Sequence, residues 1–465
     1  MGFFLSVVYL LTNYLTPPVL FGPLAQIHVE IVLAVLITLV SIPQIIRSFV
    51  FKTPQALALA GLSVAVFLSV LIGVGWPGGA ARALLEYVPN MYAFFLIGLH
   101  CNSRKKLQVL VLMLLFVCLF VIANGMRDLQ SANASAFPTG TVIPDDADFR
   151  VLEIEHPYIL HMSDDEKKVF YRVRGLGEIN DPNDLGQILV CEIPLLFIFW
   201  RPKKTMRNFA FVILPLCVLG YGIYLTHSRG ALLALLVVVL VAARRRIGTL
   251  PAGIIAAVLF AGAMALHFTG GRAISASAGA GREELWGESL QIVKSHPIFG
   301  IGLNELPHYI GYTAHNSIIV CAAELGLLGL FFWCLFLFPT MRNVLLVASP
   351  DKVTESQTVE TDEEPFSMRV WKGTTLSKTE INRFGFCMLL SLIGFLAAGW
   401  FLSRALVITF FFLGGMAEVV YETAQRRGMT APRPAFARTL YYSTGLMFGL
   451  LIAVYLMLRV LNLVR

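Results

Sequence analysis

Residues 316–339 read NSIIVCAAELGLLGLFFWCLFLFP, an apolar run that contains a single charged side chain, Glu324. A helix needs about 20 predominantly apolar residues to cross the hydrocarbon core of a bilayer, so this stretch predicts a membrane-spanning helix. Similar runs recur throughout the 465 residues, which are 57% hydrophobic and 14% charged, with a mean hydropathy of +0.73. Soluble domains carry about 25% charged residues. The sequence therefore predicts an all-α polytopic membrane protein and excludes soluble enzymes, disordered chains and disulfide scaffolds.

We expect about 12–13 transmembrane helices, separated by two long outer loops that contain short helices and by one long inner loop. The predicted spans are 3–16, 28–45, 56–76, 83–100, 107–125, 185–200, 209–226, 230–243, 251–267, 316–339, 384–402, 405–421 and 440–461. All seven cysteines lie in or beside these spans, which argues against structural disulfides and against a zinc site.

The net charge of +7 comes from short basic clusters between the apolar runs, for example at 104–106, 201–207 and 244–246. Alternate threading of the spans places these clusters on one side, which the positive-inside rule makes cytoplasmic. The clusters therefore need no nucleic-acid partner. The loops 127–184 and 268–315 then face the opposite compartment.

Three residues on that outer side could carry chemistry. Arg229 follows an apolar span directly, so it is either a snorkelling side chain at a helix end or a permanently charged fork for phosphate oxygens. Arg282 opens a predicted amphipathic helix, where the helix dipole prefers acids; it forms either a surface salt bridge or a ligand contact. His315 precedes the span 316–339, as a hydrogen-bonding residue or as an acid–base group active near neutral pH.

Several acidic residues have structural and functional interpretations. Glu192 and Glu324 are intramembrane carboxyl groups that need partners, and a regular helix would place Glu324 on the face opposite His315. The sequence DPND at 181–184 is a turn and N-cap signal for the span that follows. Asp146 and Asp148 could ligate a metal–diphosphate, although two-acid patterns are common by chance in such an acidic loop.

Five motifs follow one another in the region of roughly 185–335. They are SRGALLAL (228–235), Arg282 followed by Trp286, HPIFGIGLN (296–304), AHN (314–316) and ELGLLG (324–329). Their order and spacing resemble the O-antigen ligase / O-antigen polymerase superfamily. The resemblance implies a GT-C type glycosyltransferase that moves a glycan from an undecaprenyl diphosphate carrier to an acceptor, without a metal or other cofactor. It also implies a multi-pass protein of the bacterial inner membrane, with its active site on the periplasmic side.

By this resemblance, Arg229 and Arg282 would hold the diphosphate and His315 would be the catalytic histidine. Two guanidinium groups could neutralise the charge that develops as the diphosphate departs, and an imidazole could take the acceptor's proton. Arg404, Arg174 and Asn316 are further candidates for contacts to the diphosphate or the acceptor. The expected partners are an undecaprenyl-diphosphate-linked glycan, a glycan or lipid A core acceptor, and the lipid bilayer.

The predicted organisation consists of alternating membrane and loop segments. These are N-terminal transmembrane helices (1–126), a periplasmic loop (127–184), central transmembrane helices (185–267), a catalytic periplasmic loop (268–315), one transmembrane helix (316–339), a cytoplasmic loop (340–383) and C-terminal transmembrane helices (384–465).

Other functions remain open at this stage. A ligase and an O-antigen or exopolysaccharide polymerase would share the donor chemistry, and the acceptor could also be a protein serine. A lipid-linked glycan transporter would place ionisable residues in a cavity near the bilayer midplane and show repeat symmetry. Glu192 and Glu324 support it weakly. A non-enzymatic assembly scaffold would leave Arg229, Arg282 and His315 free to vary.

Overall fold

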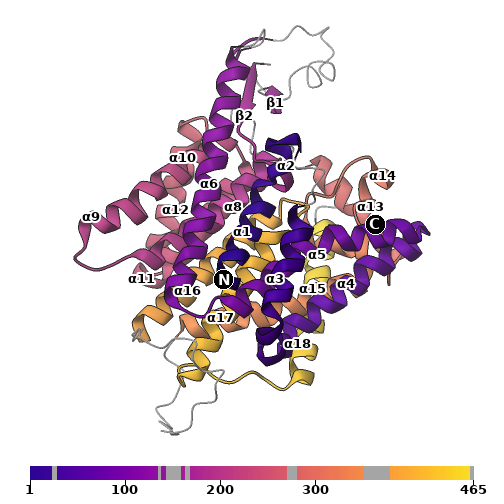
Figure 1. Cartoon of the computed structure of the whole chain (residues 1–465). Coiled ribbons are helices and arrows are strands. Elements are labelled where there is room, and N and C mark those ends of the chain that lie inside the picture. Colours follow the sequence, from indigo (N-terminus) through magenta and orange to yellow (C-terminus); the bar gives the residue numbers. More distant parts are fainter. Residues whose placement is uncertain are drawn as a thin grey trace.

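The computed structural model describes residues 1–23, 29–134, 138–142, 159–162, 168–269, 280–349 and 378–460. Within these ranges almost all regular structure is helical, and eight helices are long and apolar enough to cross a membrane. The protein is therefore an all-α polytopic membrane protein, as predicted. Figure 1 shows the helices gathered into one bundle.

The α-helices are α1 (Gly2–Leu15), α2 (Pro17–Leu20), α3 (Val29–Arg47), α4 (Pro54–Leu68), α5 (Pro77–His100), α6 (Arg104–Asn133), α8 (Pro182–Leu196), α9 (Thr205–Asn208), α10 (Leu214–Thr226), α11 (Arg229–Ile247), α12 (Thr249–Ala265), α13 (Ala280–Ser295), α14 (Leu306–Ile310), α15 (Ser317–Ala348), α16 (Lys378–Gly399), α17 (Ile408–Arg426) and α18 (Phe436–Val460). Short 3-10 or π turns are η2 (Val50–Lys52), η3 (Ser69–Val74), η4 (Gly177–Ile179), η5 (Phe197–Phe199) and η6 (Phe209–Ile213). The strands are β1 (Ile159–Met162) and β2 (Val169–Arg172).

Each predicted span coincides with a helix, but several helices are longer than the apolar window. α6 continues to Asn133 and α15 to Ala348, whereas the windows end at 125 and 339. A hydropathy window detects only the part of a helix that the hydrocarbon covers, so polar helix ends escape it. α1 and α12 are shorter apolar helices, and the total of 12–13 crossing helices therefore stays a prediction.

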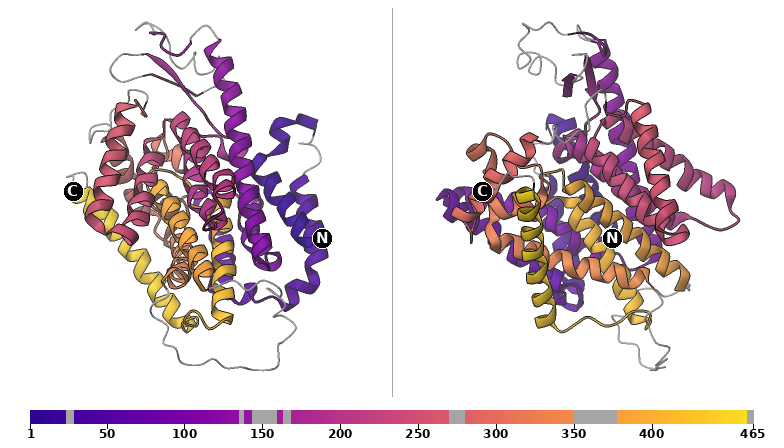
Figure 2. Two further views of the ribbon diagram at one scale, coloured as in Figure 1. Left: turned by 90° about the vertical axis from the view of Figure 1, so that its left-hand side faces the viewer. Right: turned by 180° about the vertical axis from the view of Figure 1, so that it is seen from behind.

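α15 is the central helix of the bundle and packs against α4, α16, α17 and α18. Its Trp333 stacks on Phe410 of α17, with ring centroids 5.4 Å apart, and Phe336 contacts the same ring at 4.9 Å. Phe395 of α16 stacks on Phe410 from another side, at 5.2 Å. Interlocked aromatic rings thus fix α15, α16 and α17 relative to one another. α18 lies along the outside of the bundle (Figure 2), where little of it is buried.

α15 is interrupted at Gly326, whose backbone has φ 67° and ψ −172°. The motif HPIFGIGLN passes beside this break and exchanges backbone hydrogen bonds with it. The N–H groups of Ile301 and Gly302 donate to the carbonyls of Ala323 (3.1 Å) and Glu324 (3.0 Å), and those of Leu327 and Leu328 donate to Pro297 (2.8 Å) and Ile298 (3.2 Å). In a membrane protein, backbone groups released from a helix must find partners inside the protein. The motif therefore binds the second outer loop to the broken helix.

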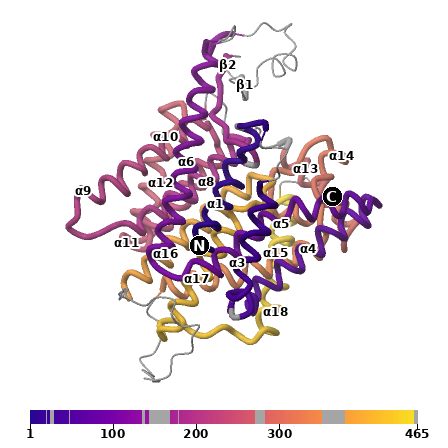
Figure 3. The backbone as a smooth tube through the Cα atoms, viewed as in Figure 1, coloured from indigo at the N-terminus to yellow at the C-terminus, as the bar shows by residue number. Residues whose placement is uncertain are grey.

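The two long loops that are predicted to face the outer compartment, 127–184 and 268–315, differ in structure. The second contains α13 and α14, and α13 is the amphipathic helix predicted around Arg282, with Trp286 and Leu290 buried. The first contains η4 and also a β-hairpin, where only short helices were expected. β1 pairs antiparallel with β2, with Ile159 opposite Arg172. Figure 3 shows this hairpin, α13 and α14 in the upper half of the view, with the link between α17 and α18 at the lower end.

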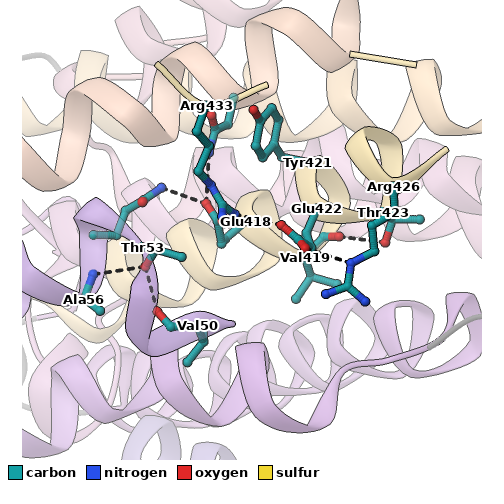
Figure 4. Close-up of polar contacts among 12 residues, drawn as sticks. Val50, Thr53, Ala56, Glu418, Val419, Tyr421, Glu422, Thr423, Arg426 and Arg433 are labelled. Carbon is teal, nitrogen blue, oxygen red and sulfur yellow. Dashed lines mark hydrogen bonds and ion pairs between the residues drawn. The ribbon is translucent and has the colours of Figure 1, made fainter. Parts of the chain in front are cut away.

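A buried ion-pair network holds that lower end together (Figure 4). Glu418 of α17 is fully buried and binds Arg433, which lies on the link between α17 and α18. The other Glu418 oxygen accepts hydrogen bonds from Gln55 of α4 (2.8 Å) and Asn343 of α15 (2.9 Å). Arg433 also reaches Glu422, at 2.8 Å. One carboxylate thus joins three helices and a loop.

Candidate active site

Two neighbouring pockets lie where the starts of α8, α11 and α15 meet the loop between α16 and α17. The smaller, here called the arginine pocket, has a volume of about 260 Å³. Its lining residues are Arg172, Asp181, Asn183, Ser228, Arg229, Gly230, Ala231, Arg282, Phe401 and Leu402. The structure therefore brings Arg229 and Arg282, which are separated by 52 intervening residues and come from different helices, into one pocket.

A sharp turn places Arg229 at the pocket. His227 ends α10 in the left-handed conformation (φ 48°), and Ser228 caps α11 by accepting a hydrogen bond from the Ala231 N–H at 3.2 Å. The same Ser228 hydroxyl donates to Asn183 at 2.8 Å. Arg229 is thus the first residue of α11, with its backbone fixed by the cap.

Arg172 is a third arginine of this pocket, and it is buried. Its Nε donates to the Thr226 carbonyl at 2.7 Å, and its guanidinium also donates to the Asn183 side-chain oxygen at 2.8 Å. These bonds connect β2 to the end of α10 and to the start of α8. Arg172 therefore adds positive charge to the pocket while holding two of its walls together.

The lining of the arginine pocket contains three arginines and one aspartate, Asp181, and so has an excess of positive charge. Burial lowers the pKa of Arg282, and the charge of Arg229 lowers it further. The second effect shows that the two guanidinium groups are close enough to repel each other. Among the described residues, no carboxylate forms an ion pair with Arg282. Two cations in a confined space favour an anion with several oxygens, because such a ligand relieves their repulsion.

The larger pocket, here called the histidine pocket, has a volume of about 450 Å³ and contains His315. Its lining residues are Glu86, Tyr87, Asn90, Asp181, Asn183, Asp184, Leu303, Asn304, Pro307, Thr313, His315, Val320, Cys321, Glu324, Leu325, Leu402, Ser403, Arg404, Ala405, Leu406 and Val407. Asp181, Asn183 and Leu402 line both pockets, so the two share a wall.

The loop between α16 and α17 fixes the position of His315. The backbone of His315 is left-handed (φ 48°), and its N–H donates to the Ser403 hydroxyl at 2.9 Å. Thr313 donates to the same hydroxyl, and Ser317 donates to the Leu402 carbonyl at 2.7 Å. The chain around His315 is therefore held on both sides, with the imidazole half-buried at the pocket.

The surroundings keep His315 neutral near pH 7. Burial lowers its pKa below the ordinary value of 6.5, the charge of Arg282 lowers it further, and Asp181 acts in the opposite direction. A neutral imidazole can accept a proton, as a general base requires. The effect of Arg282 also shows that the histidine is within electrostatic reach of the arginine pocket.

The remaining predicted site residues have different environments. Arg404 lines the histidine pocket and pairs with Asp184 at 2.5 Å. Arg174 is half-buried and lines neither pocket. Asn316 is fully buried and caps α15: its side-chain oxygen accepts from two backbone N–H groups and its amide donates to Trp400 at 3.2 Å. The structure thus brings Arg229, Arg282, His315 and Arg404 together, but not Arg174 or Asn316.

The two intramembrane carboxyl groups also differ. Glu324 lines the same pocket as His315, although a regular helix would have put the two on opposite faces; His315 precedes the helix, so that count does not apply. Glu192 is fully buried, lines neither pocket, and has no hydrogen-bond partner in the described ranges. Asp146 and Asp148 lie outside the described residues. No group of three potential metal ligands converges among the residues that the structure describes.

Several lining residues were missed in the sequence. Arg172 and Asn183 carried no signal beyond the loop and turn in which they occur. Glu86, Tyr87 and Asn90 come from α5, which resembles an ordinary apolar span. The available signal was the clustering of polar side chains in the sequence EYVPN (86–90), at the start of that span.

Both pockets lie at one end of the bundle and the basic clusters at the other. α11 begins at Arg229 and carries Arg244, Arg245 and Arg246 in its last turn, about 23–26 Å away by helical rise. α8 likewise begins at the pockets and is followed by the cluster at 201–207. The topology thus separates the site from the basic ends by about the thickness of the hydrocarbon core.

These features define a polytopic helical membrane protein with a cationic pocket beside a neutral histidine. Residues 209–334, about a quarter of the chain, match the family model described as O-antigen ligase, so this segment is similar to that family. The matched segment includes Arg229, Arg282 and His315. The match supports a function of the O-antigen ligase or polymerase type, that is, a glycosyltransferase-like enzyme in a membrane. No curated protein and no solved structure matches the chain.

Proposed function

We propose that the protein transfers a glycan from an undecaprenyl diphosphate carrier to an acceptor hydroxyl at the periplasmic face of the bacterial inner membrane. The observation that carries this proposal is the pair of adjoining pockets, one with Arg172, Arg229 and Arg282 and the other with His315. A lipid diphosphate brings its own leaving group, which suits a compartment without nucleotide donors.

In the proposed reaction, the acceptor oxygen attacks the anomeric carbon of the glycan. The bond from that carbon to the diphosphate oxygen breaks, and its electron pair stays on undecaprenyl diphosphate. Arg229 and Arg282 stabilise the additional negative charge on the diphosphate. His315 takes the proton of the acceptor hydroxyl, and a single in-line displacement inverts the anomeric configuration.

The supporting geometry favours an enzyme over a transporter. The charged pockets lie at one end of the bundle, and of the two carboxyl groups that a transport pathway could use, Glu324 lines the histidine pocket and Glu192 lines neither pocket. Ligase and polymerase activities share all the steps above and differ only in the acceptor. An assay that distinguishes ligase from polymerase activity must therefore vary the acceptor.

The test replaces Arg229→Ala, Arg282→Ala and His315→Ala singly in cells and analyses the surface glycan. Loss of one charge-stabilising donor lowers a rate by about 10²–10³-fold, and loss of a general base by about 10²–10⁴-fold. We expect each variant, at normal protein level, to lose transfer on this scale. Arg174→Ala, outside both pockets, is the matched control. Wild-type transfer by all three variants would contradict the proposal.

A second measurement uses the purified protein with undecaprenyl-diphosphate glycan, candidate acceptors and EDTA. We expect transfer to continue, because the arginines supply the charge that a metal would otherwise provide. Activity that EDTA abolishes would instead point to Asp146 and Asp148 as metal ligands.

A further inference from the structure

One wall of the histidine pocket comes from α5, which lies outside the segment that matches the O-antigen ligase model. Glu86, Tyr87 and Asn90 of α5 line the pocket together with residues of the matched segment, among them His315. Tyr87 is 2% exposed and Asn90 is 9% exposed, so both are built into the protein interior. The pocket therefore combines residues of the matched segment with residues that lie outside it.

Two polar atoms of that wall are left unsatisfied. The Tyr87 hydroxyl and the Asn90 side-chain oxygen have no hydrogen-bond partner among the described residues. An unsatisfied buried polar group costs about 1–3 kcal/mol, so such groups are uncommon without a reason. Because both residues border a cavity, a ligand that carries hydroxyl groups could complete their hydrogen bonds.

The charge of the lining restricts which ligand fits. Four carboxyl groups line the pocket, those of Glu86, Asp181, Asp184 and Glu324, against one guanidinium, that of Arg404. Asp184 is already paired with Arg404. Carboxylates accept hydrogen bonds from hydroxyl and ammonium groups, whereas they repel another carboxylate or a phosphate.

The shape and the apolar part of the lining suit a sugar ring. The volume of about 450 Å³ lies within the usual range of small-molecule sites. Leu303, Leu325, Leu402 and Leu406 provide apolar surface for the C–H faces of a ring. The arginine pocket, by contrast, is smaller and cationic.

We propose that the histidine pocket binds the acceptor through an uncharged or amino-bearing sugar, excludes sugars with a carboxylate or phosphate, and owes this selectivity in part to α5. This inference rests on the proposed transfer function, since it assumes that the acceptor hydroxyl meets His315 here. It adds to that function a chemical class of acceptor and three residues that select it.

The test measures binding of three p-nitrophenyl glycosides to the purified full-length protein in nanodiscs by saturation-transfer NMR. The probes are the β-D-glucoside, the 2-amino-2-deoxy-β-D-glucoside and the β-D-glucuronide, which differ in charge on one ring. We expect the first two to bind and the glucuronide to bind at least about tenfold more weakly. Equal or tighter binding of the glucuronide overturns the proposal.

Variants of α5 test whether its side chains contribute to sugar binding. Tyr87→Phe keeps the ring that packs edge-on against Phe411 and removes only the hydroxyl, so glucoside binding should weaken about 2–10-fold. Tyr92→Phe is the matched control, because Tyr92 lies on the same helix but its hydroxyl contacts Thr38, away from the pocket. Equal affinities of the two variants overturn the assignment of Tyr87.

A second pair of variants tests the charge. Glu86→Gln should narrow the difference in binding affinity between the glucoside and the glucuronide, whereas Arg82→Gln should not. Both break the same exposed ion pair, at 3.0 Å, but only the first removes a carboxylate from the pocket. An equal effect of both variants contradicts the proposal.

A transfer assay with the same three acceptors and undecaprenyl-diphosphate glycan separates this inference from the proposed function. Transfer without any preference by charge overturns the pocket assignment alone. Selective binding by charge, without transfer to any acceptor, overturns the proposed function and still supports the sugar pocket.

Discussion

At the scale of single residues, His315 depends on two opposing charges. Arg282 lowers the pKa of the imidazole and Asp181 raises it, while burial lowers it most. If the neutral form is the base, transfer falls as the pH drops through this lowered pKa. The acid limb of the rate profile should therefore lie below pH 6.5, the ordinary histidine value.

Substitutions of the two charged neighbours should shift that limb in opposite directions. Arg282→Gln removes a charge that lowers the pKa, so the limb moves to higher pH; Asp181→Asn removes a charge that raises it, so the limb moves to lower pH. Asparagine can still cap α8 as Asp181 does. The measurement is the pH dependence of kcat/KM, with Arg282→Lys as the control that keeps the charge. If neither variant shifts the acid limb, a group other than His315 controls the pH dependence.

At the scale of elements, the break in α15 holds the segment that carries Arg282 against the helix that follows His315. The motif HPIFGIGLN joins α13, which carries Arg282, to the helix that follows His315, through the four backbone bonds beside Gly326. A Cβ on Gly326 would lie 2.2 Å from the Ile298 carbonyl oxygen, in a left-handed conformation that disfavours side chains. The first part of the motif is therefore explained by backbone contact, while Leu303 and Asn304 at its end line the histidine pocket.

Gly326→Ala should accordingly destabilise the protein and impair transfer. Strained left-handed backbone costs about 1–3 kcal/mol, and the clash would shift the loop that leads to Arg282. We expect a lower melting temperature and at least about tenfold slower transfer at temperatures where the variant stays folded. Gly262→Ala on α12, where a Cβ meets nothing within 4 Å, is the control. Normal transfer by Gly326→Ala would show that the contacts between the motif HPIFGIGLN and the broken helix do not position the site.

At the scale of the whole molecule, the sequence predicted what local patterns determine. The spans followed from apolar runs, and α13 from an amphipathic pattern, because the bilayer and the core impose those patterns directly. Arg229, Arg282 and His315 could be selected through their motifs. The break at Gly326 could not be predicted, since it lies within an apolar run long enough to be a single membrane-spanning helix.

The missed residues depend on packing between distant segments. Asn183 and Arg172 belong to the site only because β2 and the start of α8 meet the end of α10. Tyr87 and Asn90 belong to it because α5 packs against α17 and faces the loop beside His315. Asn316 shows the converse, since a polar residue before a helix can cap that helix or bind a ligand, and only the structure shows its three hydrogen bonds. Sequence spacing carries none of this information.

The same long-range packing makes the molecule dependent on the network around Glu418 (Figure 4). Arg433→Gln leaves the fully buried Glu418 without its cation, and breaking a buried pair from one side costs on the order of 3 kcal/mol. We expect a correspondingly lower thermal midpoint in detergent. Glu418→Gln combined with Arg433→Gln should recover part of the loss, because the neutral amide no longer needs a cation and can still bond with Gln55 or Asn343. Arg82→Gln, which breaks an exposed pair, should change stability by about 0.5 kcal/mol or less. A single Arg433 variant as stable as Arg82→Gln would contradict a stabilising role for the Glu418–Arg433 pair.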